Sequence, residues 1–474
     1  MKQTGYFFAK LTCGFFALVF SILLSLSSCT KDSFITSPDA RIATSVDSLK
    51  YDTVFTSVGS ITQSFKINNL NDQKLRLSRV KLMGGAGSAF KINVNGMASP
   101  EVTDIEIASE DSIYVFVSVQ INPSMANLPF VVRDSIEITF NGNRRLVQLE
   151  AFGQNANFLR DRIIKGNVTW TNNLPYVILG SLQVEEDASL TISAGCRIFS
   201  HADAPFIIDG SLVIDGNVME KVVFTGDRLD EGYRDLPASW PGIYFRGSSK
   251  NNLLRHAVLK NAYQAIVAEQ PAPNASPKVI LQQCIIDNAY DAGILCVNSS
   301  LQADNCLVSN CGKNINIAYG GDYSFNYCTV AAYSVFIPHN KPVFTLSDFA
   351  EQNGSVLTAG LRANIENCIF WGEEGLVENE VLVSKQGTGI FEVSFSHCLY
   401  KAKQDPSNSI LDSVIKNEDP LFDSIDIGRR VFDFHISQPL APGKEKGIPT
   451  GSTRDLDDNQ RQVGLPDLGC YEKQ

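Results

Sequence analysis

The sequence is poor in several features on which a functional assignment usually depends. It has five histidines and three tryptophans in 474 residues, and 51 acidic side chains outnumber 40 basic ones, for a formal net charge of −11. Phosphate binding needs a basic footprint, so nucleic acid is not an expected partner. No Gly-x-Ser-x-Gly, Walker or dinucleotide-binding motif occurs. Beyond the first 26 residues, no apolar run approaches the roughly 20 residues that span a bilayer.

The N-terminus has the pattern of a secretion signal. Two lysines precede an apolar run from Leu11 to Leu26, and small residues then lead to Cys29. Because the run is short and ends in small residues, it predicts a cleaved signal peptide over residues 1–28 rather than a membrane span.

The end of this run also resembles the bacterial lipobox. The resemblance implies that Cys29 carries a lipid such as palmitate and tethers the mature chain to a membrane. Thr30 stands where the inner-membrane retention signal has aspartate. The resemblance therefore implies delivery to the outer membrane, facing either the periplasm or the cell surface. The alternative is an ordinary signal peptide that happens to end beside a cysteine.

Residues 46–153 predict a first β domain. Polar and apolar residues alternate with a period of two, for example from Ile113 to Val119 and from Ile136 to Phe140, with turn residues between the runs. About seven such strands favour a β-sandwich. The segment resembles the cysteine-free immunoglobulin-like domains of the abnormal-spindle and hydin type. We expect the polar residues 29–45 before it to be a tether.

Three cysteines, Cys284, Cys306 and Cys328, recur at intervals of 22 residues in the second part of the chain. The same polar-Cys-apolar-apolar phrase recurs at Cys368 and Cys398. A short strand that repeats at a fixed period predicts a solenoid, because one unit cannot bury its own apolar face. With glycine and asparagine turns and no room for helices, the repeats predict a right-handed parallel β-helix over residues 160–440.

In such a stack the cysteines form one inward column of small side chains, and asparagines such as Asn288 and Asn310 occupy turns. A disulfide framework or a metal cluster is the alternative, but CxxC pairs and paired histidines are lacking. The predicted fold class is therefore all-β, an immunoglobulin-like β-sandwich followed by a parallel β-helix. A linker is expected at residues 154–162.

Residues 441–474 are expected to cap the β-helix. Their sequence from Asp455 to Glu472 resembles the closing segment of bacterial surface proteins with pectate-lyase-like β-helix repeats. The fold in that family is shared by lyases, hydrolases and non-catalytic adhesive modules, so the resemblance implies architecture and leaves activity open.

The most charged interruption of the repeat is the loop from Thr225 to Trp240. Its carboxylates could hold a hard cation such as calcium, and its tryptophan could stack on a sugar ring. The candidate residues of this loop are Asp227, Asp230, Glu231, Asp235 and Trp240. A solvated loop whose charges pair with each other is the alternative, since the spacing matches no defined cation loop. No cofactor is assigned beyond this candidate calcium ion.

Two other sets of residues are weaker candidates. Asp457 and Asp458 are adjacent and more consistent with a turn near Arg461 than with a catalytic pair. The scattered histidines fit packing or capping roles, His256 and His397 because they occupy or adjoin the repeated phrase.

An Asp-Ser/Thr-apolar triplet resembles an O-glycosylation acceptor of some Gram-negative anaerobes, although a turn followed by a strand gives the same triplet. Its hydroxyl residues are Ser48, Thr53, Ser112, Ser135, Ser413 and Ser424.

The sequence therefore predicts a lipid-anchored envelope protein with a sandwich spacer and a β-helix that binds a polysaccharide or another envelope protein. A polysaccharide lyase or glycosidase acting on the outer face of the β-helix, near the Thr225–Trp240 loop, is the rival hypothesis.

Overall fold

The chain folds into two units with a boundary between Gln154 and Asn155. The computed structural model describes residues 33–55, 60–122, 130–333, 335–352, 354–373, 376–461 and 464–473. The predicted signal peptide and Cys29 lie outside these residues. Across the described part of the chain, no helix has the length and apolar character to cross a bilayer.

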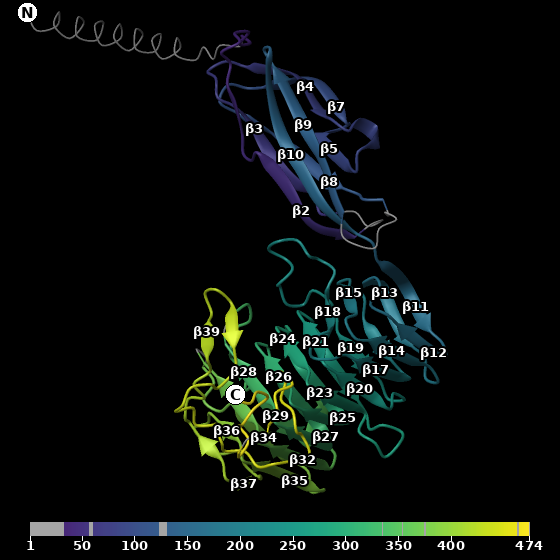
Figure 1. The fold of residues 1–474 in the computed structure, drawn as a ribbon, viewed down its shortest axis with the longest axis vertical. Coiled ribbons are helices and arrows are strands. Elements are labelled where there is room, and N and C mark those ends of the chain that lie inside the picture. Colours follow the sequence, from purple (N-terminus) through teal and green to yellow (C-terminus); the bar gives the residue numbers. More distant parts are fainter. Residues whose placement is uncertain are drawn as a thin grey trace, which may run out of the picture. The chain divides into compact units, whose positions relative to one another are not determined.

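The first unit is a β-sandwich of two five-stranded sheets (Figure 1). One sheet has the order β1 (Ile42–Thr44), β3 (Gln63–Asn69), β8 (Ser112–Val119), β5 (Phe90–Val94) and β6 (Met97–Ala98). The other has the order β2 (Ser48–Phe55), β10 (Asn143–Gln154), β9 (Phe130–Phe140), β4 (Leu75–Leu82) and β7 (Glu101–Ile107). A 3-10 turn, η1 (Gly85–Gly87), links β4 to β5. All pairings are antiparallel except that of β2 with β10.

The sandwich forms because each strand points alternate side chains inward. Val115 and Val117 of β8 and Ile136 and Ile138 of β9 are fully buried in one core. The predicted alternating runs are therefore strands, as expected. Residues 33–45 differ from the expected tether. Residues 42–44 pair with β3, because their backbone completes the edge of that sheet.

The second unit is a parallel β-helix built on a 26-stranded sheet (Figure 1). Each turn of the chain, or rung, contributes to three parallel stacks that we call sheets I, II and III. The strands of sheet I, in stacking order, are β12 (Asn167–Trp170), β14 (Ser189–Ser193), β17 (Ser211–Asp215), β20 (Asn252–Arg255), β23 (Val279–Gln282), the second halves of β25 (Ala292–Asp304) and β27 (Ile315–Asn326), β32 (Leu361–Glu366), β35 (Phe391–Ser396) and β37 (Ile410–Asp412).

Sheet II follows sheet I within each rung. Its strands are the first halves of β11 (Asn157–Ile164) and β13 (Tyr176–Val184), then β15 (Arg197–Ser200), β18 (Val222–Gly226), β21 (Ala257–Lys260), β24 (Ile285–Asp287), β26 (Leu307–Ser309), β28 (Thr329–Ala332), β33 (Ile369–Gly372), β36 (Leu399–Tyr400) and β38 (Ile415–Lys416).

Sheet III closes each rung. It comprises the second halves of β11 and β13, then β16 (Phe206–Ile208), β19 (Ile243–Phe245), β22 (Gln264–Glu269), the first halves of β25 and β27, β29 (Phe344–Ser347) and β34 (Val381–Ser384). Two antiparallel hairpins project from the β-helix, β30 (Phe349–Gln352) with β31 (Ser355–Thr358), and β39 (Ser424–Asp426) with β40 (Val431–Asp433).

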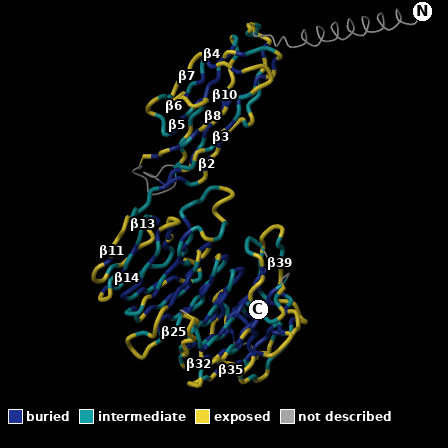
Figure 2. The backbone as a smooth tube through the Cα atoms, turned by 180° about the vertical axis from the view of Figure 1, so that it is seen from behind, coloured by how far each residue is buried: buried dark blue, intermediate teal, exposed yellow. Residues whose placement is uncertain are grey.

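The cysteine repeat marks the corner between sheets I and II. Cys284, Cys306, Cys328, Cys368 and Cys398, which stand at this corner, are free and buried, and this confirms the inward column. The predicted asparagine turns are also confirmed: Asn288 and Asn310 have φ angles of 59° and 53° at the corner between sheets II and III. Asparagine tolerates this left-handed backbone better than most residues. Figure 2 shows the buried residues along the inside of the stack.

The expected linker at residues 154–162 is wrong. Residues 157–164 already form β11, whose backbone pairs with β13. β11 is the first strand of the stack, and most of its side chains are exposed or half-buried. Its sequence therefore shows only a weak alternation of polar and apolar residues.

Residues 421–473 lie along the outer face of sheet II. Phe422, Phe434, Leu456 and Leu468 pack there against the apolar side chains of its strands. We call these residues the C-terminal segment. The β-helix therefore ends at β38, before the predicted end at residue 440, and the predicted cap from residue 441 onward is part of a longer segment that covers a flank of the β-helix.

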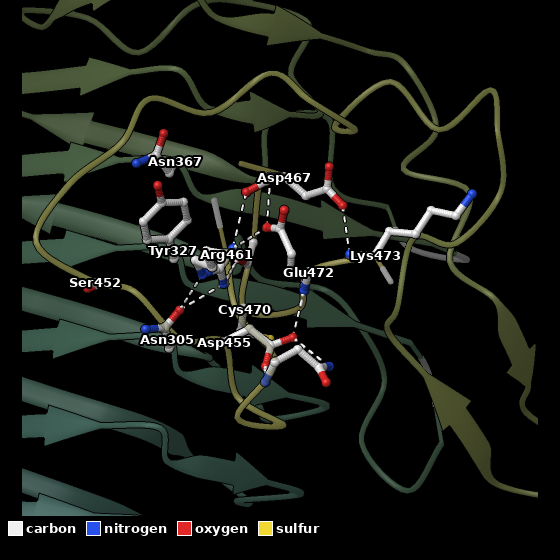
Figure 3. A network of polar contacts seen from close by, with 12 residues as sticks. Asn305, Tyr327, Asn367, Ser452, Asp455, Arg461, Asp467, Cys470, Glu472 and Lys473 are labelled. Atoms are coloured by element: carbon white, nitrogen blue, oxygen red, sulfur yellow. Dashed lines mark hydrogen bonds and ion pairs between the residues drawn. The ribbon is translucent and has the colours of Figure 1, made fainter. Parts of the chain in front are cut away.

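Arg461 fixes this segment to the cysteine corner (Figure 3). Its guanidinium is fully buried and donates to Asn305 Oδ1 at 2.7 and 3.0 Å and to the Gly469 carbonyl at 2.8 Å. It also pairs with Glu472 at 3.2 Å and lies 4.0 Å from the ring centroid of Tyr327. A cation this deeply buried is stable only with such a full set of partners.

Candidate functional site

The outer face of sheet I carries two columns of polar side chains. Parallel strands stack in register, so Gln302, Ser324, Asn364 and Ser394 occupy equivalent positions on four successive strands. The Ser394 hydroxyl donates to Asn364 Oδ1 at 2.8 Å. Alternation turns all four side chains away from the core, whereas their neighbours, such as Phe325, point inward.

The second column runs parallel to the first, two residues earlier on each strand. It consists of Ser300, Asp322, Arg362 and Glu392. The Arg362 guanidinium lies between two carboxylates, 3.1 Å from Glu392 and 3.6 Å from Asp322. All three charged side chains are more than half exposed. This ion-pair network is therefore available to a ligand and adds little to stability.

These columns form the floor of a groove of about 800 Å³. The loop from Pro271 to Pro277, between β22 and β23, forms one wall, and Asn408 and Ile410 line the groove at its far end. The volume is in the range of ligand sites in proteins, and the groove crosses several strands. We call this cavity the sheet I groove.

The backbone under the groove is held by a buried tyrosine and a glycine. The Tyr323 hydroxyl donates to the Gly320 carbonyl at 3.0 Å and accepts the Ser299 N–H at 3.1 Å. Gly321 has a φ of 119°, and a Cβ there would lie 2.2 Å from the Ser299 carbonyl oxygen. Only glycine fits this close approach of two strands, so the backbone under the groove depends on Gly321.

The Thr225–Trp240 loop differs from its predicted role. Trp240 is fully buried, and its indole Nε1 donates to the Lys260 carbonyl at 2.8 Å. Its ring packs against Phe224, with centroids 6.1 Å apart. Sugar stacking by Trp240 is therefore wrong: a backbone bridge to Ala262 and the indole hydrogen bond hold this large apolar ring in the core.

The carboxylates of the loop do not converge either. Asp227 pairs with His201 at 2.7 Å, and burial raises the pKa of Asp227. Asp230 accepts two hydrogen bonds from Arg228, at 2.7 and 2.9 Å.

The two remaining acidic residues of the loop, Glu231 and Asp235, are exposed. Among the described residues, no group of three or more histidine, cysteine or acidic side chains is placed to hold a metal ion. Asp227 and Asp230 already form ion pairs with neighbouring side chains, so the structure does not support the calcium site.

Other predicted candidates lie in turns and cores. Asp458 has a φ of 66°, which fits the turn expected there, and Asp457 pairs with His435 at 3.0 Å. Arg461 turns away from both aspartates to its buried partners. His256 is 7% exposed at a corner, and burial lowers its pKa, as suits the packing role.

The Asp-Ser/Thr triplets lie at strand starts and within strands: Ser112 begins β8, whereas Thr53 and Ser135 lie inside β2 and β9. In three of them the aspartate accepts the N–H of the next residue, at Thr53, Ser112 and Ser135. Three of the hydroxyl residues are exposed, namely Ser48, Ser413 and Ser424. O-glycosylation of these six residues stays a prediction.

Sequence reasoning missed the sheet I groove, although the repeat contains its signal. Each residue of the first column stands four positions before a cysteine, as Gln302 does before Cys306 and Asn364 before Cys368. Each residue of the second column stands six positions before a cysteine. Residues four and six positions before a cysteine share one face of the strand, because they are two residues apart. The corner residue before each cysteine has a positive φ and interrupts the alternation, so this face points outward although the cysteine points inward. The large insertions between rungs hid the alignment.

Comparisons with known proteins agree with the fold. A family model described as right handed beta helix region matches residues 153–330. This match confirms the predicted handedness. The three-sheet pattern continues to β34, and sheets I and II continue to β37 and β38. Among curated proteins, none matches the chain.

The similar solved structures are distant. The catalytic unit of a GH87 α-1,3-glucanase from Streptomyces thermodiastaticus shares 9% identity over 75% of this chain and 89% of that one, with a TM-score of 0.22. A family 123 glycoside hydrolase from Clostridium perfringens shares 9% identity over 27% of this chain, with a TM-score of 0.18. The alignment covers only 26% of that hydrolase. A PapD-like domain of human CEP192 shares 12% identity over 26% of this chain and 89% of its own, with a TM-score of 0.17. Likenesses this weak carry no argument about activity.

Proposed function

We propose that the chain is a lipid-anchored protein of the bacterial outer membrane whose β-helix binds a glycan in the sheet I groove. The observation that carries the glycan part is the groove itself, an open channel floored by two columns of hydroxyl, amide and charged side chains. Sugars present many hydroxyl groups, and a ligand of that kind needs closely spaced donors and acceptors of this sort.

The shape of the groove supports an oligosaccharide rather than a small metabolite. From Gln302 to Ser394 the first column spans four strands, or about 14 Å at the usual spacing between strands. Amide and hydroxyl groups repeat along this length at each strand. A linear glycan that lies across the strands would meet one hydrogen-bonding side chain per step.

The test is a double substitution, Asn364→Ala with Ser394→Ala, in the full chain. A glycan array first identifies a glycan that the wild type binds, and titration calorimetry then measures its affinity for both proteins. We expect about a tenfold lower affinity in the double variant, because two hydrogen-bonding groups are removed. Asn316→Ala is the matched control. This asparagine also faces outward and accepts a hydroxyl hydrogen bond, from Thr345 at 2.8 Å, but on sheet III. Wild-type affinity in the double variant, or no glycan binding by the wild type, would exclude the groove as a glycan site.

A polysaccharide lyase or glycosidase is the second candidate function. Asp322 and Glu392 lie two strands apart, or about 10 Å at the Cα atoms. This Cα separation leaves room for the roughly 6.5–9.5 Å between the carboxyl groups of inverting glycosidases. Release of reducing ends or of unsaturated uronate that Glu392→Gln abolishes would favour the enzyme. Binding without any product would favour the binding module.

The membrane part of the proposal depends on Cys29. Metabolic labelling with palmitate and fractionation of the envelope test it, with Cys29→Ala as the variant. Loss of label together with release from the outer membrane is the expected result, and surface proteolysis of intact cells would determine which side the protein faces. Another envelope protein as the ligand of the β-helix would appear as a partner crosslinked through the groove.

A further inference from the structure

The two sheets of the sandwich differ sharply in charge. In the β1-β3-β8-β5-β6 sheet, no strand contains an aspartate or a glutamate, although the chain has 51 of them. The other sheet is crossed by ion pairs between neighbouring strands, including Arg76 with Glu106 at 3.1 Å and Arg133 with Glu150 at 2.6 Å. We call the outward side of the first sheet the acid-free face.

Two aromatic rings stand on the acid-free face. Tyr114 and Phe116 alternate on β8, so both point away from the core, and they are 44% and 42% exposed. Their ring planes differ by 18°, and their centroids are 5.8 Å apart. Large aromatic side chains exposed side by side are uncommon on a monomer unless they contact something else.

Hydrogen-bonding and cationic side chains surround the rings. In the register of the sheet, Ser64 and Asn93 lie on either side of Phe116. Lys66 lies beside Tyr114, with its ammonium 4.9 Å from the ring centroid. Lys91 lies on β5, on the other side of β8 from Lys66, and is opposite Ser118. Within the described part of the chain, neither lysine forms an ion pair.

We propose that the acid-free face is a second carbohydrate-binding surface, and that it takes an acidic polysaccharide. The aromatic rings would contact the C–H faces of the sugars, and the serine and asparagine side chains would bind their hydroxyl groups. The lysines attract the carboxylate or sulfate groups, and the absence of acidic residues removes the repulsion that this acidic chain would otherwise exert.

The composition of the face favours a glycan over a protein partner. Apart from the two rings, the outward residues of β3, β8 and β5 are serine, asparagine and lysine. A stable protein interface needs a much larger apolar centre than two rings. A membrane surface is also disfavoured, because two lysines give only weak attraction to anionic lipids.

The test uses the full chain and a panel of acidic polymers, namely polygalacturonate, alginate and chondroitin sulfate, with dextran as the neutral comparison. Tyr114→Thr with Phe116→Thr should lower the affinity for the bound polymer about tenfold, because threonine keeps the strand propensity but removes the rings. Lys66→Gln with Lys91→Gln should lower affinity and flatten its dependence on salt.

Two controls make the result specific. Tyr263 and Tyr290 form another exposed, stacked pair, with centroids 5.8 Å apart, in the β-helix unit, and Tyr263→Thr with Tyr290→Thr should leave affinity unchanged. The groove variant Asn364→Ala with Ser394→Ala should also keep acidic-polymer binding, so that failure of either proposal can be told from failure of the other. An unchanged thermal midpoint checks folding.

The proposal is overturned if none of the acidic polymers binds, or if the Tyr114 and Phe116 variant binds like the wild type. Binding to phosphatidylglycerol vesicles that depends on the two rings, without polymer binding, would assign the face to membranes instead.

Discussion

Sheets I and II of the β-helix are built from the same rungs but have opposite outer faces. On sheet II, Leu307, Ile369 and Leu399 each follow a cysteine directly, and they are apolar and buried under the C-terminal segment. On sheet I the corresponding outward residues are polar and open to solvent. Because both faces share one backbone, the outward side chains alone decide which flank is covered and which can meet a ligand.

The difference separates two kinds of residue within a single repeat. Substitutions on the covered flank should change stability, because they remove buried contacts. Substitutions on the open flank should change binding and leave stability nearly unaltered. Three predictions test this separation.

The largest effect is expected at Arg461, under the C-terminal segment. Arg461→Ala leaves Glu472 and Asn305 buried without their partner, and breaking a buried ion pair in this way costs about 3–5 kcal/mol. Urea unfolding and hydrogen exchange of residues 453–473 would measure the loss. Arg454→Ala is the control, since its 55% exposed side chain makes only local contacts with Asp458. Equal effects of the two substitutions would show that the segment does not depend on the buried guanidinium.

Much of this architecture could be predicted from the sequence, for a physical reason. The inward position of Cys306 and the turn at Asn310 repeat at a fixed spacing because stacked rungs place identical environments above each other. The alternation in β8 and β9 likewise reports which side of each strand is buried. Such features depend on neighbouring residues or on a regular period, and both are visible in one chain.

The candidate site was not predictable in the same way. The charges of the Thr225–Trp240 loop are conspicuous in the sequence, yet Asp230 is held by Arg228 two residues away and Trp240 belongs to the core. The groove depends on the register between β27, β32 and β35, which insertions of different length conceal. The partner of Arg461, Asn305, is 156 residues distant, so that contact too could not be predicted from local sequence.

An intermediate, pH-dependent effect is expected at His435, which lies just after β40 and contacts the turn at Asp457 and Asp458. Its ring nitrogens contact Asp433 at 2.5 Å and Asp457 at 3.0 Å, and its ring stacks on Tyr471. The hydrogen bond with Asp457, followed by that with Asp433, raises the pKa of His435 from 6.5 to about 9.

A folded-state pKa above the unfolded value means that the stabilisation is fully present below pH 6.5 and is lost as the pH rises through about 9. The side chain is one third exposed, so we expect on the order of 1 kcal/mol after solvent screening. Unfolding of the wild type and of His435→Gln at about pH 6 and about pH 10, on either side of this range, would measure it. The difference in free energy of unfolding between wild type and variant should be smaller at the higher pH. A difference independent of pH would show that His435 acts through packing alone.

The smallest effect on stability is expected on the open flank. Asn364 is exposed, and its contact with Ser394 is made in water, so Asn364→Ala should change the free energy of unfolding by less than about 0.5 kcal/mol. Thermal and urea midpoints of the purified variant would measure this. A loss of more than about 2 kcal/mol, the usual cost of a large cavity in a core, would mean that sheet I is as structural as sheet II. With a small loss, a fall in glycan affinity for the groove variants reports on binding, because the β-helix beneath the groove is intact.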